Sequence, residues 1–314
     1  MKRGTNLVLA GMPALFASTI LAWSDPLGDP PREAGQEISL DAQPRPIDGA
    51  SFVASRKQIG QFASTIDGDH EDAGILTSGG GPYGGVVASH VVYTPAEFNL
   101  TFPAGAKGTQ TLFAPTTRAP NGSCLEVGTA YESRAGTPTN VTVYVFDFCA
   151  GLKFKRQTPV NQNFLDNYTT VTPDGLHAYT TSIVTNSPDP IQSDNWTASL
   201  FNVKSKKWDV LYSDTGQYRD LRGWTIFETW FQKGQCSKSL PNLVAFDISY
   251  RNMATGKWEV VQPQMSNLTV NEHDGKSSDV TNTNCFNDDK TGPASYRLEV
   301  IHPDSAWKIV STGH

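Results

Sequence analysis

From Val86 onward the chain alternates hydrophobic and polar positions in short runs, and clusters of glycine, proline, asparagine and serine separate these runs. Period-two alternation rich in β-branched and aromatic residues predicts strands. About a dozen strands are expected, at 86–94, 97–103, 109–115, 124–133, 140–150, 176–186, 195–203, 207–213, 223–231, 243–252, 257–263 and 296–302. The pattern predicts an all-β fold, a two-sheet antiparallel β-sandwich of the concanavalin-like jelly-roll type.

One local pattern occurs twice, at 202–210 and 252–260. Each copy begins with asparagine and runs through a lysine-containing turn to tryptophan, an acidic residue and valine. A turn between two β-rich runs predicts a hairpin, so each copy is expected to contain a tight turn just before its tryptophan. Two copies are too few for a solenoid or a propeller.

The N-terminal residues have the pattern of an export signal. Lys2 and Arg3 precede an apolar run over 7–22, and the sequence at 22–24 has the small-x-small form of a cleavage site. A glycine and a proline interrupt this run, which is also shorter than a membrane span requires. We therefore expect a signal peptide at 1–24 and a secreted product, extracellular or periplasmic, with no membrane association once the signal is removed.

The next segment has a different composition. Residues 25–50 are proline-rich, charged and poor in aromatics, whereas 51–64 fits a short amphipathic helix. The glycine cluster at 78–85 matches no phosphate-binding motif and is interpreted as a flexible junction. We predict a pro-segment or linker at 25–80, typical of a zymogen, followed by the β-sandwich domain at 81–314.

Composition and charge exclude some partners. Charged residues make up 18% of the chain, and the net charge of -6 leaves no basic stripe. Nucleic acid is therefore not an expected partner. We expect a monomer.

The four cysteines indicate disulfides. An even number of cysteines in an exported chain predicts two bridges, for which three pairings exist. We favour the sequence-local pairing, Cys124 with Cys149 and Cys236 with Cys285. Binding of a metal by these cysteines is the weaker alternative, because CxxC spacing is absent.

Several familiar catalytic motifs are missing from the sequence. It has no GxSxG and no HExxH, and its six histidines are scattered without ligand spacing. The segment 271–275 (NEHDG) has oxygen ligands for a hard cation but fits an exposed turn better. No metal and no cofactor are predicted, and carboxylates remain as the candidate chemistry.

The first candidate is Glu126. It interrupts the apolar pair Leu125 and Val127, although a buried, unpaired carboxylate costs several kcal/mol of hydration. In a strand it shares its face with Gly128 and Ala130. These small neighbours predict a trough in which a substrate reaches the carboxyl.

The second candidate is Glu228, which shares a strand face with Trp224, Ile226 and Trp230. Desolvation by this aromatic wall is expected to raise the pKa of Glu228, and a facing Glu126 would separate the two titrations further. Carboxyls with separated pKa values can divide the roles of base and proton donor. The alternative is that both are ordinary strand glutamates on a solvated face.

Four segments resemble the neprosin-type glutamic peptidases. These are YGGVVASHVVYTPAEF at 83–98, LEVG at 125–128, GWTIFETWF at 223–231 and SLPNLVAFDISY at 239–250. That family has a Tyr-Gly-rich entry strand, an Ile-Glu-Ala-Gly-like stretch and a Gly-Tyr-Trp-Pro-x-Glu stretch. Glu126 and Glu228 fall on its two glutamates, and the likeness runs over about 80–260.

The sequence departs from the family at several positions. Thr225-Ile226 replaces Trp-Pro, and Val127-Gly128-Thr129 replaces Ala-Gly-Trp. A preference for proline in the substrate is therefore not implied. The fungal glutamic peptidases, with a Gln/Glu pair, also resemble 125–128, but their second glutamate lies one residue nearer to tryptophan.

The resemblance implies an exported hydrolase, a glutamic endopeptidase acting at acid pH on a protein or peptide substrate. One glutamate, ionised, would take a proton from water, and the other, protonated, would bind the scissile carbonyl and then assist departure of the amine. The sequence does not assign these two roles. Trp224, Trp230 and Tyr131 are candidates for cleft walls or, equally, for sandwich core.

Two other readings stay open. Seven tryptophans and ten tyrosines could form stacking platforms of a secreted lectin-like sandwich that binds or cleaves polysaccharide, and paired glutamates also suit a retaining glycosidase. The pro-segment favours the peptidase. A non-catalytic secreted structural protein remains if the two glutamates lie apart in space.

Overall fold

The computed structural model of the chain describes residues 69–77, 81–98, 100, 109–134, 136, 138–150, 153–187, 189, 195–218, 220–231, 236–237, 239–262, 265–270, 285, 296–302 and 305–311. The predicted signal peptide, the predicted helix at 51–64 and the turn at 271–275 lie outside these residues. So does the predicted pro-segment up to residue 68.

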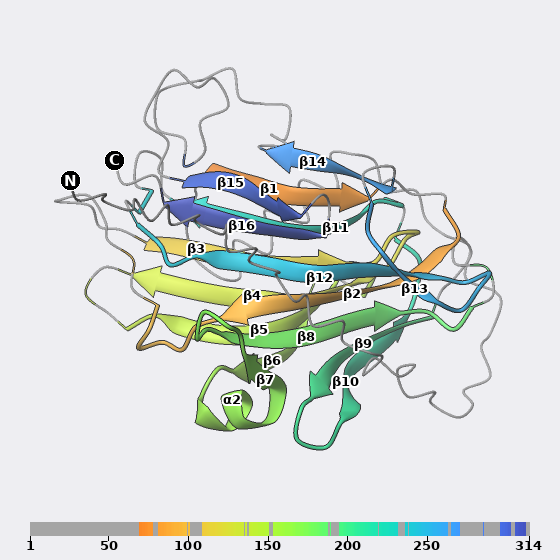
Figure 1. Ribbon diagram of the computed structural model, residues 1–314, viewed down its shortest axis with the longest axis horizontal. Helices are drawn as coiled ribbons and strands as arrows, with labels where there is room; N and C mark the ends of the chain where they lie inside the picture. The colour runs from red at the N-terminus through yellow and green to blue at the C-terminus, as the bar shows by residue number, and fades with distance from the viewer. Residues whose placement is uncertain are drawn as a thin grey trace, which may run out of the picture.

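Two antiparallel sheets form the fold (Figure 1). The seven-stranded sheet has, in spatial order, β14 (Ser266–Val270), β1 (Asp69–Thr77), β11 (Gly223–Phe231), β3 (Thr109–Arg118), β4 (Leu125–Arg134), β5 (Asn140–Asp147) and β6 (Lys153–Pro159). The nine-stranded sheet has β10 (Lys207–Thr215), β9 (Asn195–Asn202), β8 (His177–Val184), β2 (Tyr83–Val92), β12 (Leu243–Asn252), β16 (Ala306–Ser311) and β15 (Tyr296–His302), with β7 (Thr169–Val171) on β8 and β13 (Trp258–Val260) on β12. The predicted β-sandwich is confirmed.

Side chains from alternate positions join the two sheets. Thr117 of β3 bonds to His90 of β2, with 2.8 Å between Oγ1 and Nε2. Thr129 of β4 contacts the Tyr179 hydroxyl of β8 at 2.8 Å. Because side chains alternate along a strand, Glu126 and Glu228 lie on the opposite face of the seven-stranded sheet, which points away from the second sheet.

Most strands coincide with the predicted runs, but some were missed. β1 lies within the range predicted for the pro-segment and is hydrogen-bonded between β14 and β11. β6, β7, β14 and β16 were also not predicted. The run at 97–103 was predicted as a strand, whereas Glu97 and Phe98 lie in a turn. The short helix α2 (Gln162–Tyr168) begins after Asn161, whose side chain accepts a hydrogen bond from the Phe164 N–H.

A β-bulge interrupts β3 at Ala114 and Pro115, which are joined by a cis peptide bond. The pairing of β3 with both neighbours shifts by one residue between Phe113 and Thr116. A bulge bends its strand and increases the local twist. It therefore alters the curvature of the sheet near the glutamates.

Both predicted hairpins are present. β9 pairs with β10 across the turn that follows Asn202, and β12 pairs with β13 across the turn that follows Asn252. The Asn202 side chain accepts bonds from two turn N–H groups and donates to Asp209, while Asn252 does the same with Glu259 as its acceptor. The asparagine thus orders the turn and fixes the acidic residue that follows the tryptophan.

The disulfides join Cys124 to Cys149 and Cys236 to Cys285. This is the predicted sequence-local pairing. Within the described ranges, no helix is long and apolar enough to cross a membrane.

Candidate functional site

The two candidate glutamates lie on one face of one sheet. In the strand register Glu126 of β4 is level with Arg118 of β3, which is level with Trp224 of β11. Glu228 lies four residues beyond Trp224 on β11 and therefore on the same face. Although this face turns away from the second sheet, Glu126 is 1% exposed and Glu228 is 2% exposed.

Two neutral donors hold the Glu126 carboxyl. The Tyr144 hydroxyl of β5 donates to Oε1 at 2.7 Å, and Trp224 Nε1 donates to Oε2 at 2.8 Å. Indole nitrogen is only a donor, so Oε2 must accept. With both oxygens accepting, these contacts favour the ionised carboxylate.

A buried cation lies beside this carboxyl. Arg118, directly opposite Glu126 in the register, is fully buried. Its guanidinium donates to the backbone oxygens of Ser123, Asp220 and Arg222 at 2.6, 2.9 and 3.1 Å. It also lies 4.6 Å from the Trp224 ring centroid, a cation–π contact. Trp224 therefore connects the cation to the carboxyl that it bonds.

The expected trough beside Glu126 is partly filled. Gly128 is level with Tyr144, and a Cβ on Gly128 would lie 3.0 Å from the tyrosine hydroxyl. The missing side chain thus admits the hydroxyl that bonds Glu126, rather than leaving the whole space to a substrate. The sequence indicated the space but not its occupant.

Glu228 has a carboxyl neighbour that the sequence analysis missed. Asp72 of β1 is directly opposite Glu228 and is itself buried, at 7% exposure. On its other side Glu228 is level with Phe113. Directly opposite residues on antiparallel strands have Cβ atoms about 4.5–5.5 Å apart. Asp72 was overlooked because its strand lies within the range interpreted as pro-segment.

Glu126 and Glu228 are neighbours on the face but not adjacent in the register. One strand, β3, separates their strands, and Glu228 is four residues further along β11 than the level of Glu126. In a flat sheet this offset places their Cα atoms about 16 Å apart. The β3 bulge lies between the two levels, so the sheet departs from flatness there.

The predicted cleft aromatics divide between the two faces. Trp224 and Trp230 are on the face of the glutamates and are 1% and 4% exposed. Tyr131 is not on this face. Its hydroxyl accepts from the Tyr93 N–H at 3.2 Å, and its ring stacks on Phe98 at 4.0 Å between centroids. Because Tyr131 is five residues from Glu126 on a regular strand, the period-two rule turns it into the core between the sheets.

The described residues contain no group of three or more His, Cys, Asp and Glu side chains suited to hold a metal ion.

Comparisons with known proteins give only distant similarity. No family model and no curated protein matches the chain. Among solved structures, scytalido-glutamic peptidase with a peptide-based transition-state analogue has a TM-score of 0.41 and 11% identity, covering 78% of this chain and 100% of that one. A second structure of that peptidase, with a transition-state analogue inhibitor, has a TM-score of 0.41 and 10% identity over the same shares. The CBM2 module of the evolved Dit of Lactobacillus casei BL23 phage J-1 has a TM-score of 0.23 and 12% identity, covering 51% of this chain and 61% of that module.

At these TM-scores the likeness says nothing about individual residues, so function has to be inferred from the side chains of this chain. The neprosin-type resemblance stays a sequence-based prediction.

Proposed function

We propose that this protein is an exported endopeptidase that hydrolyses peptide bonds at acid pH with Glu126 and Glu228. The observation that carries the proposal is the burial of both carboxyls on one sheet face, with both oxygens of Glu126 held by donors. The signal-like N-terminus and the two disulfides support export.

In this proposal Glu126 is the base. Tyr144 and Trp224 donate to its two oxygens, and Arg118 is its cross-strand neighbour. Each of these groups favours the charged form of the carboxyl. Glu126 thus stays ionised in acid and accepts a proton from an attacking water.

Glu228 is the proton donor. Asp72 lies directly opposite it, and two carboxyls so close do not readily ionise together. The buried aromatic neighbours Phe113 and Trp230 also disfavour charge. A protonated Glu228 can hydrogen-bond the scissile carbonyl.

The reaction then balances without a further reagent. The water oxygen bonds to the carbonyl carbon as Glu126 takes one water proton, and Glu228 stabilises the developing oxyanion. The C–N bond breaks as Glu228 gives its proton to the leaving amine. Transfer of the proton from Glu126 to Glu228 restores the starting state.

The polysaccharide alternative receives less support. Sugar stacking requires exposed aromatic faces, but five tryptophans within the described ranges are at most 7% exposed: Trp196, Trp208, Trp224, Trp230 and Trp307. Binding of a glycan through them would require these rings to leave the protein interior. A peptide substrate would likewise have to reach the buried carboxyls of Glu126 and Glu228, but its binding does not depend on exposed tryptophan faces.

The test is cleavage of casein and of a mixed peptide library by the purified full-length protein, incubated from about pH 3 to about pH 7. The parent should cleave in acid, and Glu126→Gln and Glu228→Gln should each lose at least about a hundredfold in kcat/KM. Each substitution keeps side-chain shape while removing the ability to exchange a proton.

Glu132→Gln is the matched control. Glu132 lies on the same face of β4, is half-buried and accepts a hydrogen bond from Asn140. It should retain parental activity. An inactive parent protein contradicts the proposal, and so does unchanged cleavage by either Glu126→Gln or Glu228→Gln. If the parent is inactive and is retained on a glycan array, the polysaccharide alternative is favoured.

A further inference from the structure

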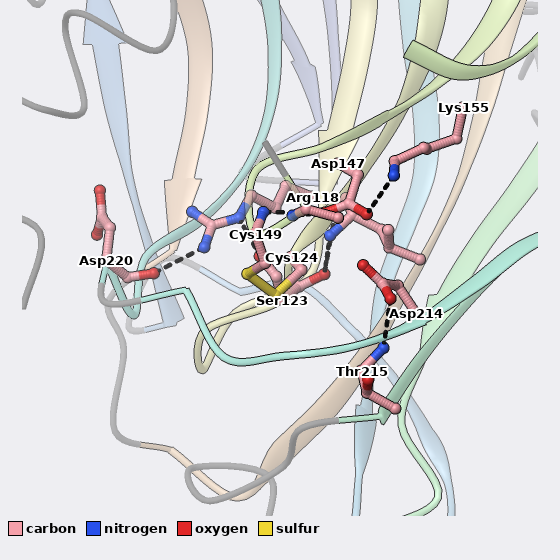
Figure 2. Close-up of a disulfide and its surroundings, with 11 residues drawn as sticks. Arg118, Ser123, Cys124, Asp147, Cys149, Lys155, Asp214, Thr215 and Asp220 are labelled. Atoms are coloured by element: carbon pink, nitrogen blue, oxygen red, sulfur yellow. Dashed lines mark hydrogen bonds and ion pairs between the residues drawn. A yellow bond between two sulfur atoms is a disulfide. The ribbon is translucent and has the colours of Figure 1, made fainter. Parts of the chain in front are cut away.

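Two aspartates face each other where the sheets meet at one edge of the sandwich. Asp147 ends β5 of the seven-stranded sheet, and Asp214 lies near the end of β10, the edge strand of the nine-stranded sheet. Figure 2 shows both carboxyls beside the Cys124–Cys149 disulfide. Neither residue belongs to the face that carries the two glutamates. Asp147 is level with Leu125 rather than with Glu126, and Asp214 belongs to the other sheet.

In each carboxyl the hydrogen bonds from backbone N–H groups go to Oδ1. Asp147 Oδ1 accepts from the N–H groups of Cys149 and Ala150 at 2.8 and 2.9 Å, and Asp214 Oδ1 accepts from the N–H of Thr215 at 2.8 Å. The Oδ2 atoms of both aspartates are buried and receive no hydrogen bond from an N–H or O–H donor of the described residues. One proton shared between the two carboxyls would give both Oδ2 atoms a partner.

A single cation faces this pair among the described residues. Lys155 Nζ lies 3.7 Å from Asp147 Oδ2, and it is also 5.4 Å from the ring centroid of Tyr212 on β10. Lys155 is the extra residue of a bulge where β6 pairs with β5, which accounts for its departure from the regular alternation. One ammonium cannot neutralise two carboxylates, so the remaining negative charge favours protonation of one of the two carboxyls.

The loop after Asp214 is fixed against the disulfide. Gly216 has φ +147°, and a Cβ there would lie 3.0 Å from Cys149 Cβ and 3.1 Å from Cys124 Sγ. Only glycine allows the backbone to pass so close in this conformation. The loop after Asp214 therefore stays packed on the disulfide, so repulsion between charged Asp147 and Asp214 carboxylates is not relieved by a shift of this loop and acts on β10 instead.

We propose that Asp147 and Asp214 form a proton-dependent clasp between the two sheets, closed in acid by a shared proton and opened at neutral pH when both carboxyls are charged. β10 is the element that opens, because among the described strands it lies at the sheet edge and pairs with β9 alone. An edge strand can separate locally without unfolding the remaining sandwich.

The direction of titration agrees with this geometry. Burial, followed by the hydrogen bond to Asp147 and the charge of Asp147, raises the pKa of Asp214 to about 7. Since the unfolded aspartate has its ordinary, lower pKa, the folded protein binds more protons between the two values. This contribution to stability is complete in acid and is lost as pH rises toward about 7.

The test is amide hydrogen exchange of the full-length protein at about pH 5 and about pH 8, corrected for intrinsic exchange rates. Protection of β10 amides should fall about tenfold or more on going to the higher pH, while the central strands β2 and β8 change less. Asp214→Asn should abolish this dependence, because the amide keeps the shape, donates to Asp147 and does not titrate.

Asp174→Asn, at an exposed turn position, is the matched control and should behave as wild type. Lys155→Met should move the opening to higher pH, because it removes the charge that favours ionised carboxyls. An unaltered pH dependence in Asp214→Asn, or a shift to lower pH in Lys155→Met, overturns the proposal.

If Asp214→Asn does not fold, carbon NMR of the wild-type Asp214 carboxyl decides: a midpoint near about 7 supports the clasp, and an ordinary midpoint near about 4 overturns it. None of these measurements depends on peptidase activity.

Discussion

Trp224 and Glu126 are separated by 98 positions in the chain, yet the indole Nε1 lies 2.8 Å from the carboxyl Oε2. The contact reaches across β3, which lies between their two strands. The Arg118 guanidinium lies over the same indole ring in a cation–π contact. Trp224 therefore positions the carboxyl that we propose as the base.

Trp224→Phe tests this positioning. The variant keeps an aromatic ring but removes the donor, and a hydrogen bond to a charged group is worth about 1.5–3 kcal/mol. If Glu126 acts as base, kcat/KM should fall about tenfold to a hundredfold, and the acid limb of the pH profile should move to higher pH because the carboxylate is less stabilised. Steady-state kinetics across the acid range measures both effects.

Tyr144→Phe removes the other donor and should shift the same limb in the same direction. A loss of activity with an unshifted profile in both variants would mean that the two residues support the fold rather than the ionisation of Glu126.

Gly128→Ala should damage both stability and the site. The added methyl would lie 2.8 Å from the Pro115 carbonyl oxygen and 3.0 Å from the Tyr144 hydroxyl. Overpacking of this kind costs about 1–3 kcal/mol. We expect a lower urea midpoint and reduced activity. An unchanged midpoint would show that the β3 backbone shifts to accommodate the methyl group at little cost in stability.

Local patterns predicted much of this fold, because alternation and turn residues act over a few neighbouring positions. The strand containing Glu126 and both asparagine-headed turns followed from such patterns. The run at 69–77 did not, since its acidic start and its glycine hide a strand whose partners lie far away in the sequence. The cross-strand neighbours Asp72 and Tyr144 depend on register, which no short pattern specifies.

Tyr131 illustrates a different point. The sequence left this aromatic open between a cleft wall and the sandwich core, and its odd spacing from Glu126 places it on the core face. Strict use of the period-two rule would have separated the two faces. No sequence pattern indicates that Asp147 and Asp214 are neighbours, because their strands belong to different sheets.

Removal of the Cys124–Cys149 disulfide should have both a general and a local effect. Its ends are 25 residues apart, and closing such a loop contributes about 3.5 kcal/mol in the chain-entropy account. Replacing both cysteines by serine should lower the urea stability by about this amount. Because Cys124 lies two residues before Glu126, activity should also fall under conditions where the variant is fully folded.

The Cys236–Cys285 pair provides the comparison, with ends 49 residues apart and an expected contribution of about 4 kcal/mol. Its removal should destabilise the protein at least as much while sparing kcat/KM of the folded fraction. Equal loss of activity in the two double variants would contradict a local role for the first disulfide.

His90 opposes the clasp in its effect on stability. It is fully buried between Tyr179 and Thr117, whose hydroxyls lie 3.0 and 2.8 Å from its ring nitrogens. Burial lowers the pKa of His90 to about 3, so the folded protein holds it neutral where the unfolded chain would protonate it. Between about pH 6.5 and about pH 3 the unfolded chain therefore binds more protons, and stability falls as pH falls.

His90→Gln should be less stable than wild type at neutral pH, because it disturbs two buried hydrogen bonds, each worth about 1 kcal/mol. Its stability should nevertheless decline less on acidification, since glutamine takes up no proton in the unfolded state. Urea unfolding at about pH 7 and about pH 4 measures both quantities for each protein. If the variant lost as much stability as wild type between these two pH values, another buried group would have to supply the acid sensitivity. The combination with Asp214→Asn should leave the smallest net dependence, because the two groups bind protons in opposite senses in the folded state.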